Sequence, residues 1–146
     1  MAIETPCDVL IVEDNPQLGD EMVGFIARTG AVVCLARDGA SALQLAAESE
    51  PRVLILDYNL PDMTGLQLAE RLRPALPSAA MIMMSGRIDG MSEQTLQNLG
   101  IRVFLNKPVP LGLLRQAVTK LLNGSVAPVK RAAANGWLSA GLGGVR

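Results

Sequence analysis

The chain predicts an α/β fold in which helices cover both faces of a parallel β-sheet. Two observations lead to this expectation. Short apolar runs alternate along the sequence with longer stretches whose apolar residues recur at helical spacing. Two of the runs also end in acids just before a turn, Glu13 and Asp14 after the first and Asp57 after the third. Open α/β sheets bind ligands at the carboxyl ends of their strands, so these acids indicate a site.

Five runs are short and apolar enough to be strands. The clearest is 53–56, which has four consecutive apolar residues and ends shortly before a turn rich in Pro and Gly. Such a run is typical of a strand that is buried on both faces. The predicted strands span 8–12, 31–36, 53–56, 80–84 and 102–105.

Helices are predicted between and after these strands. Asn15 and Pro16 form a typical helix start, with a capping side chain followed by proline in the first turn. Asp38 is placed to cap the second helix, and Leu114 and Val118 lie on the apolar face of the last one. The predicted helices span 16–29, 40–47, 65–73, 92–99 and 110–122.

Five strand–helix units in succession imply right-handed crossovers with helices on both faces. For five parallel strands we expect the flavodoxin-like doubly wound order 2-1-3-4-5, which places the first and third strands side by side. The acids at their tips, Glu13, Asp14 and Asp57, should then meet in one crevice.

The composition limits the class of protein. The chain has 146 residues, 49% of them hydrophobic, which suits one domain with its own core. A net charge of −1 argues against direct nucleic acid binding. Neither a membrane-spanning stretch nor a signal peptide is predicted, so we expect a cytoplasmic protein. The expected division is a lead at 1–6, a domain at 7–122 and a tail at 123–146.

The tail differs in composition from the rest. It is rich in Ala and Gly, has basic but no acidic residues, and contains the single tryptophan, Trp137. We expect a flexible tail, and the alternative is a docking segment that orders on a partner.

The absence of histidine and the spacing of the two cysteines limit the kinds of site that the chain can form. The chain contains no histidine, which excludes imidazole zinc ligands and histidine-based nucleophile activation. Cys7 and Cys34 have no motif spacing and are expected to be buried free thiols in a reducing compartment.

A cation is expected among the three acids. Carboxylates at contact distance repel each other by about 1–4 kcal/mol per pair, and a divalent hard cation removes that cost. Mg²⁺ suits such a site because it accepts one or two carboxylates and keeps room for a phosphate oxygen. Ser85 and Lys107 follow the fourth and fifth predicted strands, so a hydroxyl and an ammonium group should face the same crevice. Together these groups indicate a pocket for a tetrahedral anion bound to a carboxylate.

These motifs, on four strand ends, resemble the receiver domain of response regulators from two-component signalling, of the chemotaxis-regulator type. The resemblance covers about 7–122. It is carried by Glu13-Asp14, the segment from Asp57 through Leu60-Pro61 to Gly65, Ser85-Gly86, Phe104 and Lys107-Pro108.

The resemblance implies a role for each matching residue. Asp57 would accept a phosphoryl group from a phosphohistidine, supplied in trans by a sensor histidine kinase or a histidine phosphotransfer protein. Glu13, Asp14 and Asp57, with the main-chain carbonyl of Asn59, would hold Mg²⁺ or Mn²⁺. Lys107 would pair with the phosphoryl group, and its bond to Pro108 is usually cis in the family.

The resemblance also implies a switch and an output. Ser85 would move towards the phosphoryl group and Phe104 would turn inward, where the family more often has Thr and Tyr. The surface of the fourth helix, fifth strand and fifth helix would signal to a downstream protein. Asn59 and Arg87 would tune the phosphoryl lifetime. The expected protein is a regulatory domain rather than an enzyme, and a monomer or weak homodimer.

Two other classes of protein are alternatives to a receiver domain. A phosphatase or phosphotransferase with an aspartyl-phosphate intermediate would need an acid two residues after Asp57, where this chain has Asn59. A flavin or nucleotide module would need a Gly/Ser-rich loop after the first strand, where Glu13 to Pro16 stand instead.

Overall fold

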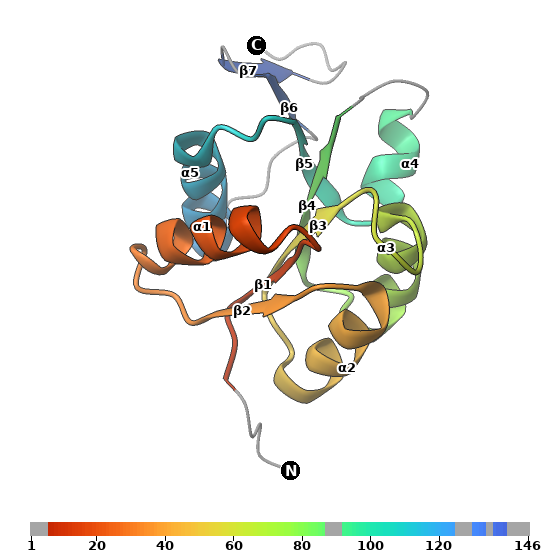
Figure 1. Ribbon diagram of the computed structural model, residues 1–146. Coiled ribbons are helices and arrows are strands. Elements are labelled where there is room, and N and C mark those ends of the chain that lie inside the picture. Colours follow the sequence, from red (N-terminus) through yellow and green to blue (C-terminus); the bar gives the residue numbers. More distant parts are fainter. Residues whose placement is uncertain (1–5, 87–91, 125–129, 134–135, 140–146) are drawn as a thin grey trace.

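The computed structural model describes residues 6–86 and 92–124, and the backbone of 130–133 and 136–139 (Figure 1). Strands and helices alternate through the first five units, as the hydrophobic pattern predicts. The elements are β1 (Val9–Val12), α1 (Pro16–Ala27), β2 (Val33–Ala36), α2 (Gly39–Ser49), β3 (Val53–Asp57), α3 (Gly65–Ala75), β4 (Ala80–Ser85), α4 (Glu93–Asn98), β5 (Ile101–Asn106), α5 (Leu111–Leu122), β6 (Lys130–Ala133) and β7 (Gly136–Ser139).

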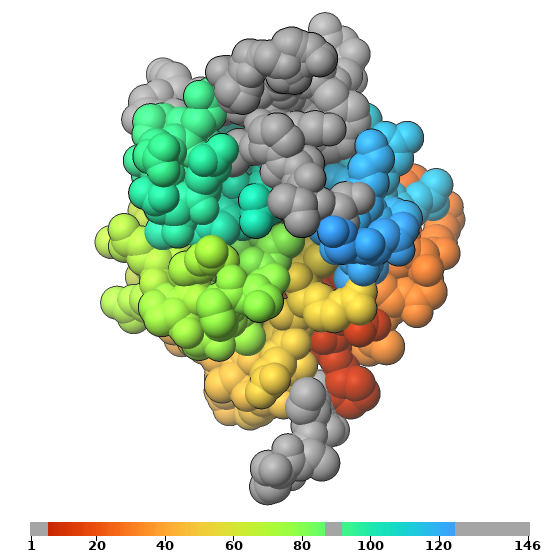
Figure 2. Space-filling model, turned by 180° about the vertical axis from the view of Figure 1, so that it is seen from behind, coloured from red at the N-terminus to blue at the C-terminus, as the bar shows by residue number. Residues whose placement is uncertain are grey.

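The first five strands are parallel and lie in the order β2-β1-β3-β4-β5. The predicted flavodoxin-like order is therefore confirmed. Helices α1 and α5 cover one face of the sheet, and α2, α3 and α4 cover the other (Figure 1). Seen from behind, α5 (blue) lies beside α1 (orange), with α3 and α4 (green to teal) on the other side (Figure 2).

The packing of strand β3 explains why residues 53–56 form an unbroken apolar run in the sequence. Leu54 and Leu56 pack in the core beneath α2, α3 and α4, whereas Val53 and Ile55 pack in the core beneath α1 and α5. All four are fully buried. Burial of each such side chain stabilises the fold by about 1.5–3 kcal/mol, so both faces of the strand favour apolar residues.

The predicted helix starts are present. The Asn15 side chain accepts a hydrogen bond from the main-chain N–H of Leu18 at 2.9 Å, and Asp38 accepts one from that of Ser41 at 2.7 Å. Helix α3 begins with a capping box that the sequence analysis does not include, in which Thr64 and Gln67 each bond the other's main-chain N–H. No helix of the described ranges is long and apolar enough to cross a membrane.

A β-hairpin lies in the region where the sequence analysis expects a flexible tail. Strand β6 pairs in parallel with β5, and β7, which contains Trp137, pairs antiparallel with β6 (Figure 1). The sheet therefore has seven strands in the order β2-β1-β3-β4-β5-β6-β7. Hydrophobic patterning does not signal this pairing, because an edge strand can recruit another strand through main-chain groups alone.

Candidate functional site

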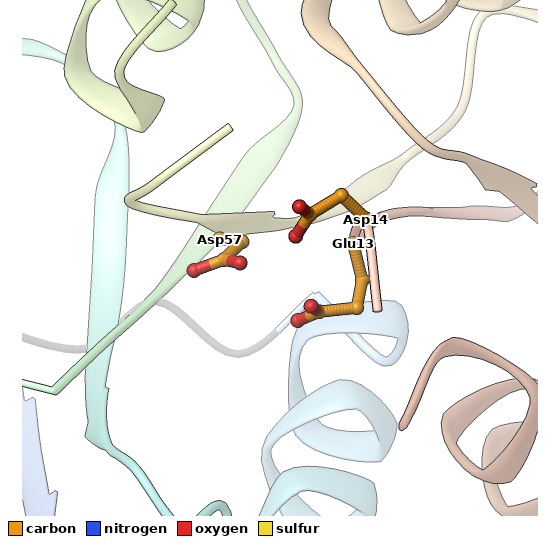
Figure 3. A group of neighbouring side chains, drawn as sticks. All are labelled: Glu13, Asp14 and Asp57. Carbon is orange, nitrogen blue, oxygen red and sulfur yellow. The ribbon is translucent and has the colours of Figure 1, made fainter. Parts of the chain in front are cut away.

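Three carboxylates lie together at the carboxyl edge of the sheet. Glu13 and Asp14 follow β1, and Asp57 is the last residue of β3. The parallel register pairs Val12 with Leu56, which brings the two strand ends level. One carboxylate oxygen from each acid lies within 4.8 Å of the other two. Figure 3 shows the three side chains turned towards one space. The three acids therefore meet at one edge of the sheet, as the strand order predicts.

Two of the three acids are buried. Glu13 is 1% exposed and Asp57 is 3% exposed, whereas Asp14 is on the surface. Burial raises the pKa of Glu13, and the charge of Asp57 adds to this rise. The main-chain N–H of Asn15, which donates to Glu13 Oε2 at 3.1 Å, opposes it, as does Lys107. Close, buried carboxylates favour a cation between them.

Lys107 supplies one such cation. Its Nζ lies 3.2 Å from Asp57 Oδ2 and 3.4 Å from Glu13 Oε1. The main-chain N–H of Lys107 donates to the Ser85 carbonyl at 2.8 Å, and the bond from Lys107 to Pro108 is cis. Burial acts to lower the pKa of the ammonium group, but the two carboxylates outweigh it and raise that pKa. Lys107 is therefore charged and directed towards the carboxylates of Glu13 and Asp57.

The loop after β3 is shaped closely around Asp57. The main-chain N–H of Asn59 donates to Asp57 Oδ1 at 3.3 Å. Gly65, the first residue of α3, donates its N–H to the Tyr58 carbonyl at 2.6 Å. A Cβ atom on Gly65 would lie 2.5 Å from the Asp57 carbonyl oxygen, so no larger residue fits without a shift of the backbone.

Asp62 has a role in this loop that the sequence analysis missed. Its carboxylate accepts hydrogen bonds from the main-chain N–H groups of Gly39 at 2.8 Å and Ala40 at 3.0 Å, at the start of α2. These bonds lower the pKa of Asp62. An acid after Leu60-Pro61 is a weak signal, since only the fold shows that α2 begins beside it.

The remaining predicted residues lie at or near the same edge. Ser85 ends β4 and is 5% exposed. The residue before it in β4, Met84, pairs with Asp57 of β3, so Ser85 lies at the same edge of the sheet as Asp57. Phe104, in β5, is fully buried in the core beneath α2, α3 and α4. Arg87 lies outside the described residues.

Comparison with known proteins identifies the family. Residues 9–119 match the family described as the response regulator receiver domain. The chain belongs to this family. Receiver domains are the regulatory phosphoacceptor modules of two-component systems, so this chain takes part in phosphorylation-dependent signal transduction.

Relatives of this receiver domain include larger proteins. The transcriptional regulatory protein KdpE of Mycobacterium tuberculosis (strain ATCC 25618 / H37Rv) is 35% identical over 116 residues, which cover 77% of this chain and 51% of KdpE. The sensor protein TorS of Escherichia coli K12 is 32% identical over 116 residues, 78% of this chain and 13% of TorS. This chain spans about half the length of the first curated regulators that it matches.

Solved structures share the receiver fold. A CheY-like receiver domain protein from Methanospirillum hungatei JF-1 superposes with a TM-score of 0.75 at 23% identity, over 82% of this chain and 96% of that one. A putative response regulator from Chloroflexus aurantiacus J-10-fl has a TM-score of 0.71 at 27% identity, over 82% of this chain and 99% of that one.

The donor atoms of this receiver domain suit a hard divalent cation. They are all oxygens and come from Glu13, Asp14 and Asp57, two of them buried and one open to solvent. Mg²⁺ prefers such oxygen ligands and normally keeps several waters, which the exposed side at Asp14 permits. Lys107 compensates part of the negative charge, and the exposed Asp14 leaves its side of the acidic cluster in contact with solvent.

Proposed function

We propose that Asp57 accepts a phosphoryl group from a phosphohistidine on a separate protein, a sensor histidine kinase or a histidine phosphotransfer protein. The observation that carries this proposal is the buried Asp57 carboxylate, held 3.2 Å from the Lys107 ammonium beside two further acids. This chain has no histidine, so the imidazole donor has to come from a partner.

The transfer is a simple displacement. An Asp57 carboxylate oxygen forms a bond to phosphorus, the bond from phosphorus to the donor imidazole nitrogen breaks, and the imidazole leaves with the electron pair. Glu13, Asp14 and Asp57, with the main-chain carbonyl of Asn59, would hold Mg²⁺ or Mn²⁺. The bound ion would supply positive charge opposite the oxygens of the transferring group.

Lys107 contributes a preorganised charge. Its ammonium group already lies against Asp57 and Glu13 before any phosphoryl group arrives. It can therefore pair with a phosphoryl oxygen with little reorganisation, which is the condition under which electrostatic stabilisation is most effective. The Asn59 N–H, bonded to Asp57 Oδ1, holds the carboxylate in place.

We propose that Ser85 and Phe104 relay the modification. The added phosphoryl oxygens would draw the Ser85 hydroxyl, and Phe104 would take its inward position in the space that is released. Because Phe104 is fully buried in this structure, the proposed change is a shift of its rotamer within the core and not a move from solvent into it. The surface formed by α4, β5 and α5 would then change and be read by a downstream protein in the cytoplasm, with the receiver as a monomer or weak homodimer.

Phosphoryl uptake tests the central proposal. The chain is incubated with acetyl phosphate and MgCl₂ and then measured by intact mass spectrometry. We expect one phosphoryl adduct in wild type and none in Asp57→Asn. The matched control is Asp20→Asn, an exposed acid on α1, which should gain the adduct normally. An adduct that persists in Asp57→Asn would overturn the assignment.

Lifetime is tested separately. We propose that Asn59 and Arg87 tune the hydrolysis of the acyl phosphate. After removal of the phosphodonor, the adduct in Asn59→Ala and in Arg87→Ala should decay at a rate different from wild type. Unchanged decay in both variants would remove these residues from the proposal.

An enzyme with turnover is the second candidate, and the geometry disfavours it. The main-chain N–H of Asn59 contacts Asp57, and its amide side chain cannot serve as a general acid or base. We therefore propose self-catalysed phosphoryl uptake and slow autodephosphorylation only. Sustained release of phosphate from p-nitrophenyl phosphate, lost in Asp57→Asn, would favour the enzyme.

A further inference from the structure

The outer edge of β5 is covered by the hairpin of β6 and β7. Without the hairpin, β5 would be the last strand of the sheet, with unpaired main-chain groups along its free side. Strand β6 runs along that side (Figure 1). The paired residues are Val103 with Lys130, Phe104 with Arg131 and Leu105 with Ala132.

This edge leads directly to the candidate site. Strand β5 carries Phe104 and continues into Lys107, whose main-chain N–H donates to the Ser85 carbonyl on β4. Main-chain groups of successive residues in a strand point to opposite sides. The N–H of Leu105 is therefore expected to face β4, as that of Lys107 does, and the N–H of Phe104 to face β6. Pairing with β6 thus engages the main chain of the proposed switch residue.

The hairpin lies outside the part of this chain that matches the receiver family. The match to the receiver family ends at residue 119, before β6 begins at Lys130. The solved structure from Methanospirillum hungatei is covered over 96% of its length by 82% of this chain. The hairpin lies at the end of the strand order β2-β1-β3-β4-β5-β6-β7, so its detachment would leave the pairings from β2 to β5 unbroken.

We propose that the β5 edge, which β6 occupies in this structure, is an acceptor for an extended polypeptide segment. The resident segment is the chain's own β6. In one respect the inference rests on the proposed function: a downstream protein that pairs with β5 on the α4–β5–α5 surface must first displace the hairpin. Occupancy of the edge itself does not depend on phosphorylation.

Residue-resolved amide hydrogen exchange on the full chain tests occupancy. Ala132→Pro removes a main-chain N–H from β6, which a strand between two neighbours does not tolerate. We expect the Phe104 amide to exchange at least about tenfold faster in this variant. The Leu105 amide, which faces β4, should be unchanged and is the internal control. Arg131→Ala, which keeps the main chain, should behave as wild type.

A second experiment tests the acceptor. A chain ended after Gly124 should show the same fast exchange at Phe104, and a synthetic peptide with the sequence of residues 129–140 should slow it again. The peptide carrying Ala132→Pro is the matched control and should have no effect. Equal exchange at Phe104 in wild type, Ala132→Pro and the shortened chain, or no effect of the wild-type peptide, would overturn the proposal.

Both experiments are repeated in an Asp57→Asn background. The protection of Phe104 should be the same there, because no phosphoryl group is involved. Failure of wild type to gain a phosphoryl adduct, with normal protection of Phe104, would refute the proposed function alone. A normal adduct in wild type, with Phe104 exchanging equally in wild type, Ala132→Pro and the shortened chain, would refute the strand-acceptor proposal alone.

Discussion

The Lys107 ammonium lies 3.2 Å from Oδ2 of Asp57 and thereby joins the end of β5 to the end of β3. The same group lies 3.4 Å from Glu13 at the end of β1. One cation therefore bridges two buried carboxylates from two other strands. This bridge makes the site sensitive to both charge and backbone geometry.

Removal of that cation should destabilise the fold. In Lys107→Met, Glu13 and Asp57 would face each other without compensation, and we expect the free energy of unfolding to fall by about 1–3 kcal/mol. Added Mg²⁺ should restore part of the loss, because a divalent ion offsets the same repulsion. The measurement is urea unfolding with and without MgCl₂. Lys120→Met, an exposed change on α5, should stay within about 0.5 kcal/mol of wild type. Equal stability of Lys107→Met and wild type without Mg²⁺ would contradict the prediction.

Gly65 should not tolerate a side chain. A Cβ atom there would lie 2.5 Å from the Asp57 carbonyl oxygen and 2.8 Å from Met83 Sδ. We expect Gly65→Ala to cost about 1–3 kcal/mol of stability in thermal or urea unfolding. The matched control is Gly24→Ala, inside α1, where a Cβ would meet nothing within 4 Å. That change should stabilise by about 0.5–1 kcal/mol through helix propensity. A Gly65→Ala protein as stable as wild type would show that the loop can adapt.

Asp62 should give a pH-dependent contribution to stability. Hydrogen bonds from Gly39 and Ala40 lower its pKa in the folded state below the ordinary 3.8. Stability from such a group is fully present above the unfolded-state pKa and is lost as pH falls through the lowered, folded-state value. The difference in unfolding free energy between wild type and Asp62→Asn should therefore be constant near neutral pH. It should shrink only as the pH falls below 3.8. Ser41→Ala at the same helix start has no titrating group and should give a pH-independent offset. A difference between wild type and Asp62→Asn that does not change with pH would count against the contact.

The two thiols should differ in reactivity. Burial raises the pKa of Cys7 to about 12, and a hydrogen bond with Cys34 adds to this rise. Cys34 is only half-buried, and both cysteines are free. Because the thiolate is the reactive form, iodoacetamide at about pH 8 should label Cys34 first and Cys7 only after unfolding. Intact mass before and after addition of guanidinium chloride measures this. Labelling of Cys7 in the native Cys34→Ser variant at the rate of the unfolded chain would disprove it.

Much of the fold follows from local signals in the sequence. Apolar runs such as 53–56 are long enough for a strand and too short for a helix, and Asn15 and Asp38 mark helix starts by side chains that bond the next turn. These are relations between near neighbours in the chain. Repetition of the strand–helix unit then leaves few topologies, because crossovers between parallel strands are right-handed.

The sequence by itself determined the five strand–helix units, their order in the sheet and the acids at the strand ends. Hydrophobic periodicity and the acids that follow the apolar runs are both patterns of neighbouring residues, so they are visible without the tertiary structure. Only the tertiary structure decided that Asp62 bonds the start of α2, that Lys107 reaches Glu13 as well as Asp57, and that β6 pairs with β5. Each of these contacts joins groups that are distant in the chain. Their partners are largely main-chain groups or shared charges, for which no residue pattern is required, so only the path of the backbone selects them.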